Sequence, residues 1–187
     1  LQAMGEGSRK GGAPDEELAA LAAALDDAKA QLAALMERAE GAAADILAFQ
    51  LAMMEDEALI APAKDEILGG APADRAWRRV LDAQIADYAG ADDEYFRARV
   101  SDLEDIRDGV LRQLSGHAAR MLPEGAIIAA EDLTPSRFLS HDWRRGGAIA
   151  LAKGSPSSHV AMLARARHVP MVVGIDFDPA ELRPGAP

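Results

Sequence analysis

Cysteine is absent from the 187 residues of this chain, which excludes disulfides and thiolate metal sites. Long apolar runs are absent as well, and none approaches the roughly 18 residues that a membrane-spanning helix needs. The sequence does not open with a basic stretch followed by an apolar one, so it predicts no leader peptide. Together these absences predict a cytoplasmic protein that makes no contact with a membrane.

Basic residues are scarce relative to acidic ones, with 20 Lys and Arg against 31 Asp and Glu and a formal net charge of -11. Nucleic-acid binding needs clustered cations, so this charge argues against a nucleic-acid partner. It favours a basic protein partner, although surface charge often serves solubility alone. The four histidines are scattered, and the sequence therefore predicts no metal site in this chain.

The segment from about residue 14 to 117 has few β-branched residues and favours helices. Its first part carries an apolar stripe at spacings of three and four residues, made by Leu18, Leu21, Leu25, Ala28, Leu32, Leu35 and Ala39. Such a stripe has to be buried against other helices. Helical spacing continues from Ile46 until Gly69 and Gly70 interrupt it.

Two further helices are expected over 76–88 and 95–114. The second has one apolar face, made by Phe96, Leu103, Ile106, Val110 and Leu114. The whole segment predicts a bundle or a pair of long helical hairpins.

After Leu122 the pattern changes to short apolar runs bounded by turn residues, over 125–130, 148–152 and 171–174. Each run is typical of a strand. A helical pattern lies between the last two, behind the loop that runs from Gly154 to Ser158. A strand, a loop, a helix and a second strand predict an α/β unit.

His159 therefore falls in the first turn of a helix that follows a strand. The first amides of a helix lack internal partners and carry partial positive charge, which makes them a ready site for phosphate. The same field disfavours a charged imidazolium and keeps the ring nucleophilic. Ser157 and Ser158 can cap the helix or orient the ring, and Gly154 allows a close backbone approach.

These features are what forming and holding a phosphohistidine requires. On physical grounds alone, however, a histidine near a helix start is more often a capped surface residue than a catalyst. His117, His141 and His168 are interpreted as structural or solvated. Arg165 could reach a phosphate, but its place in the helix is more typical of a surface ion-pair partner.

The stretch GSPSSHVAMLARARHVPMVVG resembles the phosphohistidine signature of the phosphoenolpyruvate-dependent phosphotransferases, GGxTSHxAIxARxxxIPxVVG. The two align without a gap. The matched positions are Gly154, Ser158, His159, Ala161, Ala164, Arg165, Pro170, Val173 and Gly174.

Two helical stretches narrow the resemblance to enzyme I of the sugar phosphotransferase system. MMEDEALIAPAKDEI is similar to its LLEDEEL stretch, and DDEYFRARVSDLEDI to its DDEYLKERAADVRDI helix. EDLTPS also matches, so the resemblance covers nearly everything after Glu16.

The chain departs from the family at a few positions of interest. Ser155, Pro156 and Ser157 stand where the family has a second glycine, a basic residue and a threonine. Gln50 stands where many enzymes I have a histidine, and Glu104 where an arginine is common.

The resemblance implies a swivelling α/β phosphohistidine domain with an inserted four-helix, hairpin-like subdomain that binds the carrier. It places a linker from a missing N-terminal strand at 1–13, the carrier-binding subdomain at 14–117 and a truncated phosphohistidine domain at 118–187. Phosphoenolpyruvate and magnesium would bind in an absent C-terminal barrel, with no cofactor in this fragment. The full-length enzyme is expected to be a homodimer.

In this reading His159 takes the phosphoryl group and passes it to the small carrier HPr, in sugar uptake or its nitrogen-regulatory counterpart. Ser157, Ser158 and Gly154 would support the ring and the phosphoryl group. The predicted docking residues on the helices are Gln50, Met53, Met54, Glu55, Asp56 and Glu57. Two alternatives are a dikinase-like phosphohistidine domain and a helical scaffold that kept the fold without the chemistry.

Overall fold

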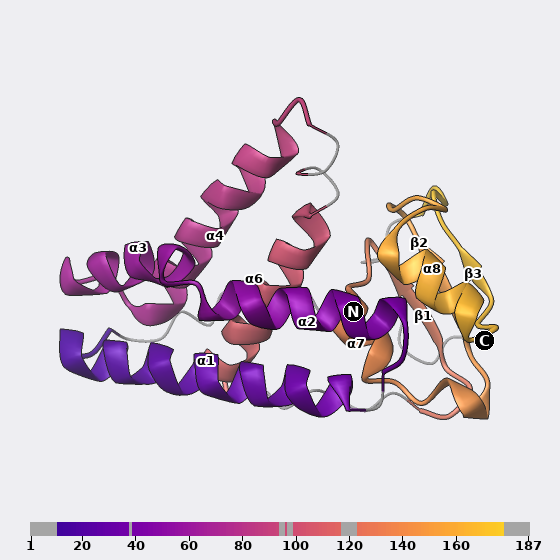
Figure 1. Ribbon diagram of the computed structural model, residues 1–187, viewed down its shortest axis with the longest axis horizontal. Coiled ribbons are helices and arrows are strands. Elements are labelled where there is room, and N and C mark those ends of the chain that lie inside the picture. The colour runs from indigo at the N-terminus through magenta and orange to yellow at the C-terminus, as the bar shows by residue number, and fades with distance from the viewer. Residues whose placement is uncertain (1–10, 38, 94–95, 97–98, 117–122, 178–187) are drawn as a thin grey trace. The chain divides into compact units, whose positions relative to one another are not determined.

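The computed structural model describes residues 11–37, 39–93, 96, 99–116 and 123–177. The chain divides into two compact units, and their described residues lie within 11–116 for one unit and within 123–177 for the other. The described part of the first unit is helical, and the described part of the second combines strands and helices (Figure 1).

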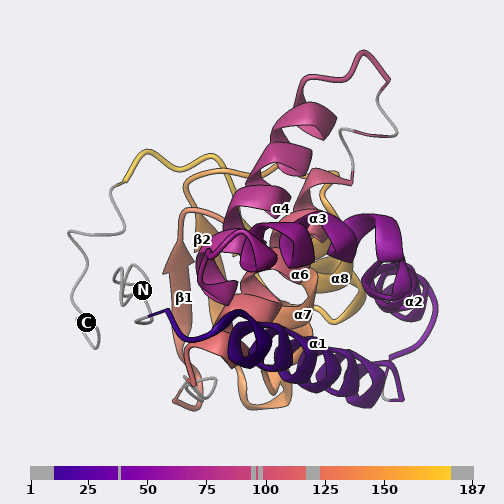
Figure 2. The ribbon, with the colours of Figure 1, turned by 90° about the vertical axis from the view of Figure 1, so that its left-hand side faces the viewer.

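The helical unit contains α1 (Pro14–Met36), α2 (Ala42–Glu55), α3 (Glu57–Leu68), α4 (Ala73–Ala89) and α6 (Val100–Leu114). Helix α1 runs beside α2 and also packs against α6, and α4 packs against both α3 and α6 (Figures 1 and 2). The predicted bundle of helices is therefore confirmed. No described helix is long and apolar enough to cross a membrane.

Helix α1 begins with Pro14 and has three acidic residues in its first turn, which complement the positive end of the helix dipole. The middle of the predicted stripe is buried, with Leu21 at 1% exposure. Burying a leucine stabilises the fold by about 1.5–3 kcal/mol, so these positions dominate the packing of α1.

Glu17 is a buried link between two helix starts that the sequence pattern did not reveal. Its carboxylate accepts from the Gly12 amide at 2.9 Å and from the Ala73 amide at 2.8 Å. Ala73 opens α4, whose N-cap is Pro72 and forms no side-chain cap of its own. Glu17 therefore caps α4 from α1, because it satisfies one of the amides that a helix leaves open.

The helix expected to run from Ile46 to Gly69 is in fact two helices, because the chain turns at Asp56. Asp56 has an extended backbone, ends α2 and caps α3 by accepting from the Ala58 amide at 2.9 Å. Aspartate favours this position because its short carboxylate competes for nearby amides.

The last predicted helix of the unit begins later than expected, at Val100. Phe96 precedes it and is 40% exposed, with its ring edge-on to Tyr88 at 5.2 Å between centroids. Its assignment to the inner face is wrong, whereas Leu103, Ile106, Val110 and Leu114 are buried as predicted. Residue 95 lies outside the described residues.

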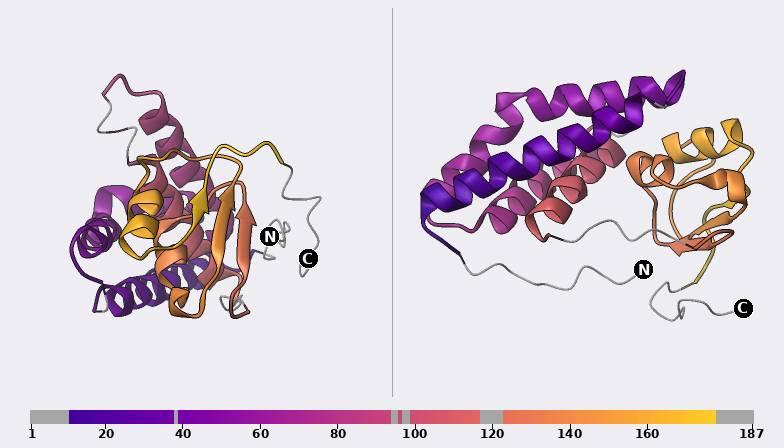
Figure 3. Two further views of the ribbon diagram at one scale, coloured as in Figure 1. Left: turned by 90° about the vertical axis from the view of Figure 1, so that its right-hand side faces the viewer. Right: turned by 90° about the horizontal axis from the view of Figure 1, so that it is seen from below.

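The α/β unit contains β1 (Ile127–Ala130), α7 (Pro135–Leu139), a short 3-10 helix η1 (Trp143–Arg145), β2 (Ala148–Leu151), α8 (His159–Ala166) and β3 (Met171–Val172). The strands are parallel in the order β1-β2-β3, with Ile128 paired to Ile149 and Ile149 to Met171. Helices α7 and α8 lie on the same face of the sheet (Figure 3). The predicted strand, loop, helix and strand are confirmed.

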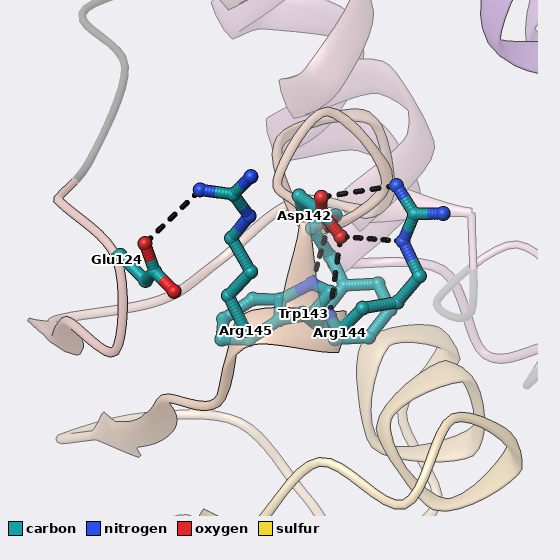
Figure 4. A network of polar contacts seen from close by, with 6 residues as sticks. Glu124, Asp142, Trp143, Arg144 and Arg145 are labelled. Atoms are coloured by element: carbon teal, nitrogen blue, oxygen red, sulfur yellow. Dashed lines mark hydrogen bonds and ion pairs between the residues drawn. The ribbon is translucent and has the colours of Figure 1, made fainter.

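A polar network fixes the chain before β2 (Figure 4). Asp142 caps η1 and binds both the backbone amide and the guanidinium of Arg144, while Arg145 binds Glu124 at 3.0 Å. The Arg144 side chain, and then its backbone amide, lower the pKa of Asp142 from 3.8 to about 2. Trp143 stacks on Phe138 and donates to its carbonyl at 2.8 Å. This segment leads into β2, from which the candidate site follows.

Candidate functional site

The loop after β2 turns sharply at Gly154, which has a φ of 91°. Residues other than glycine rarely adopt a φ in this range, so the backbone conformation favours glycine at this position. A Cβ atom here would lie 3.7 Å or more from its neighbours, so space does not exclude it. The close backbone approach expected at Gly154 stays a prediction, and what favours glycine in the structure is the backbone angle.

The serines of the loop form hydrogen bonds with one another. Ser155 Oγ lies 2.8 Å from Ser157 Oγ and also accepts from the Ser157 amide at 3.1 Å. The Ser158 amide donates to the Ser155 carbonyl at 3.1 Å. Ser155, Pro156 and Ser157 are exposed, so the loop is presented to solvent.

Ser158 is the N-cap of α8, as the sequence predicts, and its hydroxyl accepts from the Ala161 amide at 3.3 Å. His159 is the first residue of the helix. Its side chain is partly exposed, but the ring nitrogen Nδ1 is buried. Nε2 is therefore the nitrogen at which the ring can meet a reactant.

The next amide along, that of Val160, donates to no acceptor among the described residues. An open amide at the start of a helix attracts anions, because the helix dipole places partial positive charge there. The structure thus brings a partly exposed imidazole together in one helical turn with an amide that has no acceptor among the described residues, although Val160 itself is 4% exposed.

Arg165 lies in the last turn of α8, and Nη1 of its guanidinium donates to the carbonyl oxygen of Pro156 at 2.7 Å. The interpretation of Arg165 as a surface ion-pair partner is wrong, because its partner is a backbone carbonyl of the loop. Side chains on a helix lean toward its N-terminus, which is how this arginine reaches back to the loop.

An open pocket of about 670 Å³ lies at the carboxyl end of the sheet. It is lined by Glu131, Ala152, Lys153, Gly174, Ile175, Asp176 and Phe177. Lys153 precedes the loop and pairs with Glu131. Sequence reasoning named Gly174 as a matched position of the signature and began the EDLTPS match at Glu131, but it predicted no site here, although the carboxyl ends of parallel strands are a general place for sites.

The other histidines lie in different surroundings. His141 packs edge-on against Trp143 at 4.4 Å between centroids, and His168 is exposed in a left-handed turn with a φ of 54°. Neither lies in the first turn of a helix, and His117 is outside the described residues. The described residues contain no group of three or more His, Cys, Asp or Glu that could hold a metal.

The predicted docking residues divide into two sets. Glu55, Asp56 and Glu57 are exposed at the junction of α2 and α3, and Met53 is partly exposed. Gln50 and Met54 are 0% and 1% exposed, so their assignment to a docking surface is wrong. They share the inner face of α2 with Leu47, at helical spacings of three and four residues.

Gln50 has a structural role instead. Its amide nitrogen lies 3.4 Å from Asp102 Oδ1 and 3.3 Å from Asp105 Oδ2, two carboxylates buried on α6. Arg99 binds the second oxygen of Asp102 at 3.2 Å and stacks over the Phe49 ring. We call Gln50, Asp102, Asp105, Arg99 and Phe49 the α2–α6 polar cluster. Glu104, the other departure from the family, is partly exposed.

The sequence matches two families. Residues 4–99 match the family described as "PEP-utilising enzyme, N-terminal". Residues 122–186 match the family described as "PEP-utilising enzyme, mobile domain". The chain belongs to the PEP-utilising enzyme family. The predicted membership is therefore confirmed.

Curated relatives agree with this assignment. The chain is 32% identical to the phosphoenolpyruvate-protein phosphotransferase of Priestia megaterium over 86% of its length, and 34% identical to that of Streptomyces coelicolor over 81%. It is also 33% identical over 57% of its length to multiphosphoryl transfer protein 1 of Escherichia coli. The matched regions span 29%, 28% and 13% of these relatives, so the chain corresponds to less than a third of each.

Solved structures confirm the fold. An enzyme I solution structure is 27% identical, with a TM-score of 0.68 over 86% of this chain and 68% of that one. The N-terminal domain of a nitrogen enzyme I gives a TM-score of 0.67 over 92% of this chain and 75% of that one, at 24% identity. The predicted pairing of a helical domain with a phosphohistidine-type α/β domain is the fold of these proteins.

Proposed function

We propose that this chain is the phosphohistidine-bearing part of a phosphoenolpyruvate-protein phosphotransferase, and that His159 carries the phosphoryl group. The observation that carries the proposal is the partly exposed imidazole at the start of α8, beside the open Val160 amide. Family membership and the names of the relatives support the same class of reaction.

In the first step, the Nε2 lone pair of His159 attacks the phosphorus of phosphoenolpyruvate. The N–P bond forms as the P–O bond to the enol breaks, and the departing enolate takes up a proton to give pyruvate. In the second step, a histidine nitrogen of the carrier attacks the same phosphorus, and the electron pair of the N–P bond returns to Nε2. Both steps need in-line approach to an exposed nitrogen.

The loop and the helix start supply charge stabilisation in both steps. The open Val160 amide and the dipole of α8 favour the negative charge that the phosphoryl oxygens carry. The Ser157 hydroxyl, held by Ser155, lies in the exposed loop two residues before His159. Ser158 fixes the first turn through its cap, so the ring is held at a defined place.

Phosphoenolpyruvate and magnesium would bind elsewhere in the enzyme. Magnesium prefers several oxygen ligands, and the described residues offer no group of three or more that could hold a metal. We therefore assign no step of metal chemistry to the described residues of this chain. The proposed second partner is an HPr-type carrier, and the exposed acidic junction at Glu55, Asp56 and Glu57 is its proposed docking site.

The test is transfer from a phosphorylated HPr-type carrier to the chain, followed by mass spectrometry at alkaline pH, where a phosphoramidate survives. Label is expected on His159 in the unsubstituted chain, to be retained in His168→Ala and lost in His159→Ala. Label that persists in His159→Ala would move the site to another residue. A folded chain that accepts no label would support a scaffold without chemistry.

A further inference from the structure

A charged side chain from the far end of α8 holds the loop before His159. Arg165 Nη1 donates to the Pro156 carbonyl oxygen at 2.7 Å, across nine residues of sequence. Proline has no amide hydrogen, so its carbonyl is its one backbone hydrogen-bonding group. Arg165 therefore binds the one backbone group through which Pro156 can form a hydrogen bond.

The other hydrogen bonds of this loop are local. Ser155 binds the hydroxyl and amide of Ser157 and the amide of Ser158, and Ser158 caps the first turn. Among the described residues, the Arg165 contact is the hydrogen bond that ties loop residues 155–157 to the body of α8. Without it, the exposed loop depends on contacts among its own serines and on its covalent ends.

We propose that Arg165 is a positioning residue for phosphotransfer at His159, which it serves by holding Pro156 and the serine loop against α8. The inference rests on the function proposed above. Arg165 forms and breaks no covalent bond in this role. It fixes the Ser157 hydroxyl relative to the ring, because Ser157 follows Pro156 directly and shares its turn.

The chemistry of arginine suits this role. A charge-assisted hydrogen bond to a carbonyl is stronger than a neutral one. A lysine keeps the charge and can donate to a single carbonyl oxygen, so Arg165→Lys should retain part of the restraint. Arg165→Met keeps the aliphatic stem and removes every donor. Arg137→Met is a matched control, because Arg137 is exposed in α7 of the same unit and its side chain has no hydrogen bond or ion pair with the described residues.

The first measurement is amide hydrogen exchange of Ser157 and Ser158 by NMR, on the full 187-residue chain. Loss of one charge-assisted contact from an exposed loop should speed exchange of both amides about tenfold in Arg165→Met. Arg165→Lys should show a smaller increase, and Arg137→Met none. Unchanged exchange rates of these amides in Arg165→Met would overturn the proposal, since the loop would then keep its structure without the Arg165 hydrogen bond.

The second measurement is steady-state phosphoryl exchange from a phosphorylated HPr-type carrier to an unphosphorylated, isotope-labelled copy of the same carrier, with the chain as the catalyst. Misplacing a supporting group typically costs about 10- to 100-fold in rate, so kcat should fall by this factor in Arg165→Met while KM for the carrier stays unchanged. Partial rescue by Arg165→Lys is expected. A rise in KM with an unchanged kcat would overturn the proposal and assign Arg165 to carrier binding.

The two measurements separate this inference from the proposed function. If the unsubstituted chain accepts no label on His159, the proposed function fails whatever the exchange rates are. If His159 is labelled but the Arg165 variants transfer normally, the proposed function stands and the positioning role fails.

Discussion

Replacing Gln50 should destabilise the helical unit strongly, because its amide lies between two buried carboxylates. Gln50→Leu removes the contacts to Asp102 and Asp105, at 3.4 and 3.3 Å. A hydrogen bond to a charged group contributes about 1.5–3 kcal/mol. Both contacts are long, so we take the lower end for each, which gives a loss of about 3 kcal/mol.

One gain offsets part of this loss. Gln50 Oε1 is buried and has no hydrogen-bond partner among the described residues, and leucine removes that unsatisfied atom. Relief of an unsatisfied buried acceptor restores about 1 kcal/mol, so the net loss should be about 2 kcal/mol. Gln50→Glu should be worse, since it adds a third carboxylate to the α2–α6 polar cluster.

The assay is urea unfolding followed by the fluorescence of Trp77. Trp77 is buried in α4, and its indole donates to the Arg107 carbonyl on α6 at 3.2 Å, so it reports on the helical unit. The chain has two tryptophans, and Trp143→Phe leaves Trp77 alone. Leu68→Gln is a control, because Leu68 is 61% exposed. A free energy of unfolding within about 0.5 kcal/mol of the parent in Gln50→Leu would refute the reasoning.

Three further predictions concern the cap, the acidic junction and the network before β2. Ser158→Ala should lower the stability of the α/β unit by about 1 kcal/mol, measured by urea unfolding followed at NMR signals of α8, and no change would show that the cap contributes nothing. Reversing charge with Glu55→Lys and Glu57→Lys should weaken carrier binding, with a smaller effect at high salt; calorimetric affinities equal to the parent's would move the docking site elsewhere. Because the pKa of Asp142 is lowered to about 2, its stabilising contribution is present above its ordinary value of 3.8 and is lost as the pH falls through about 2. In Arg144→Met an NMR titration should show the pKa of Asp142 rising toward its ordinary value, and an unshifted titration would contradict the assigned cause.

The spacing of apolar residues in the sequence predicted most of the helices and strands. It could do so because the buried face of a helix or strand requires apolar side chains at regular intervals. The stripe of α1 and the apolar runs of β1 and β2 are local signals of this kind. The break at Asp56 was missed because aspartate is compatible both with a helix and with its cap. The η1 network and the cap from Glu17 to Ala73 were missed because each depends on tertiary contacts.

In the candidate site, too, the features that depend on local sequence could be predicted, whereas those that depend on tertiary contacts could not. The loop, the Ser158 cap and the place of His159 follow from a short contiguous stretch, so the sequence could predict them. Burial of Gln50 and Met54 depends on which side of α2 meets α6, and a resemblance to docking helices does not specify this for each residue. Helical side chains point toward the N-terminus of their helix, so the sequence could have predicted that the Arg165 side chain points toward the loop. It could not have predicted that the acceptor is the Pro156 carbonyl.

The most direct test of the central claim is a nitrogen-15 NMR spectrum of the histidine rings before and after reaction with a phosphorylated HPr-type carrier. Because Nδ1 of His159 is buried, the account predicts that Nε2 of His159 alone shows phosphorus coupling and a large shift. The rings of His141 and His168 should keep their signals. Coupling at His159 Nδ1, or at any other histidine, would contradict the account.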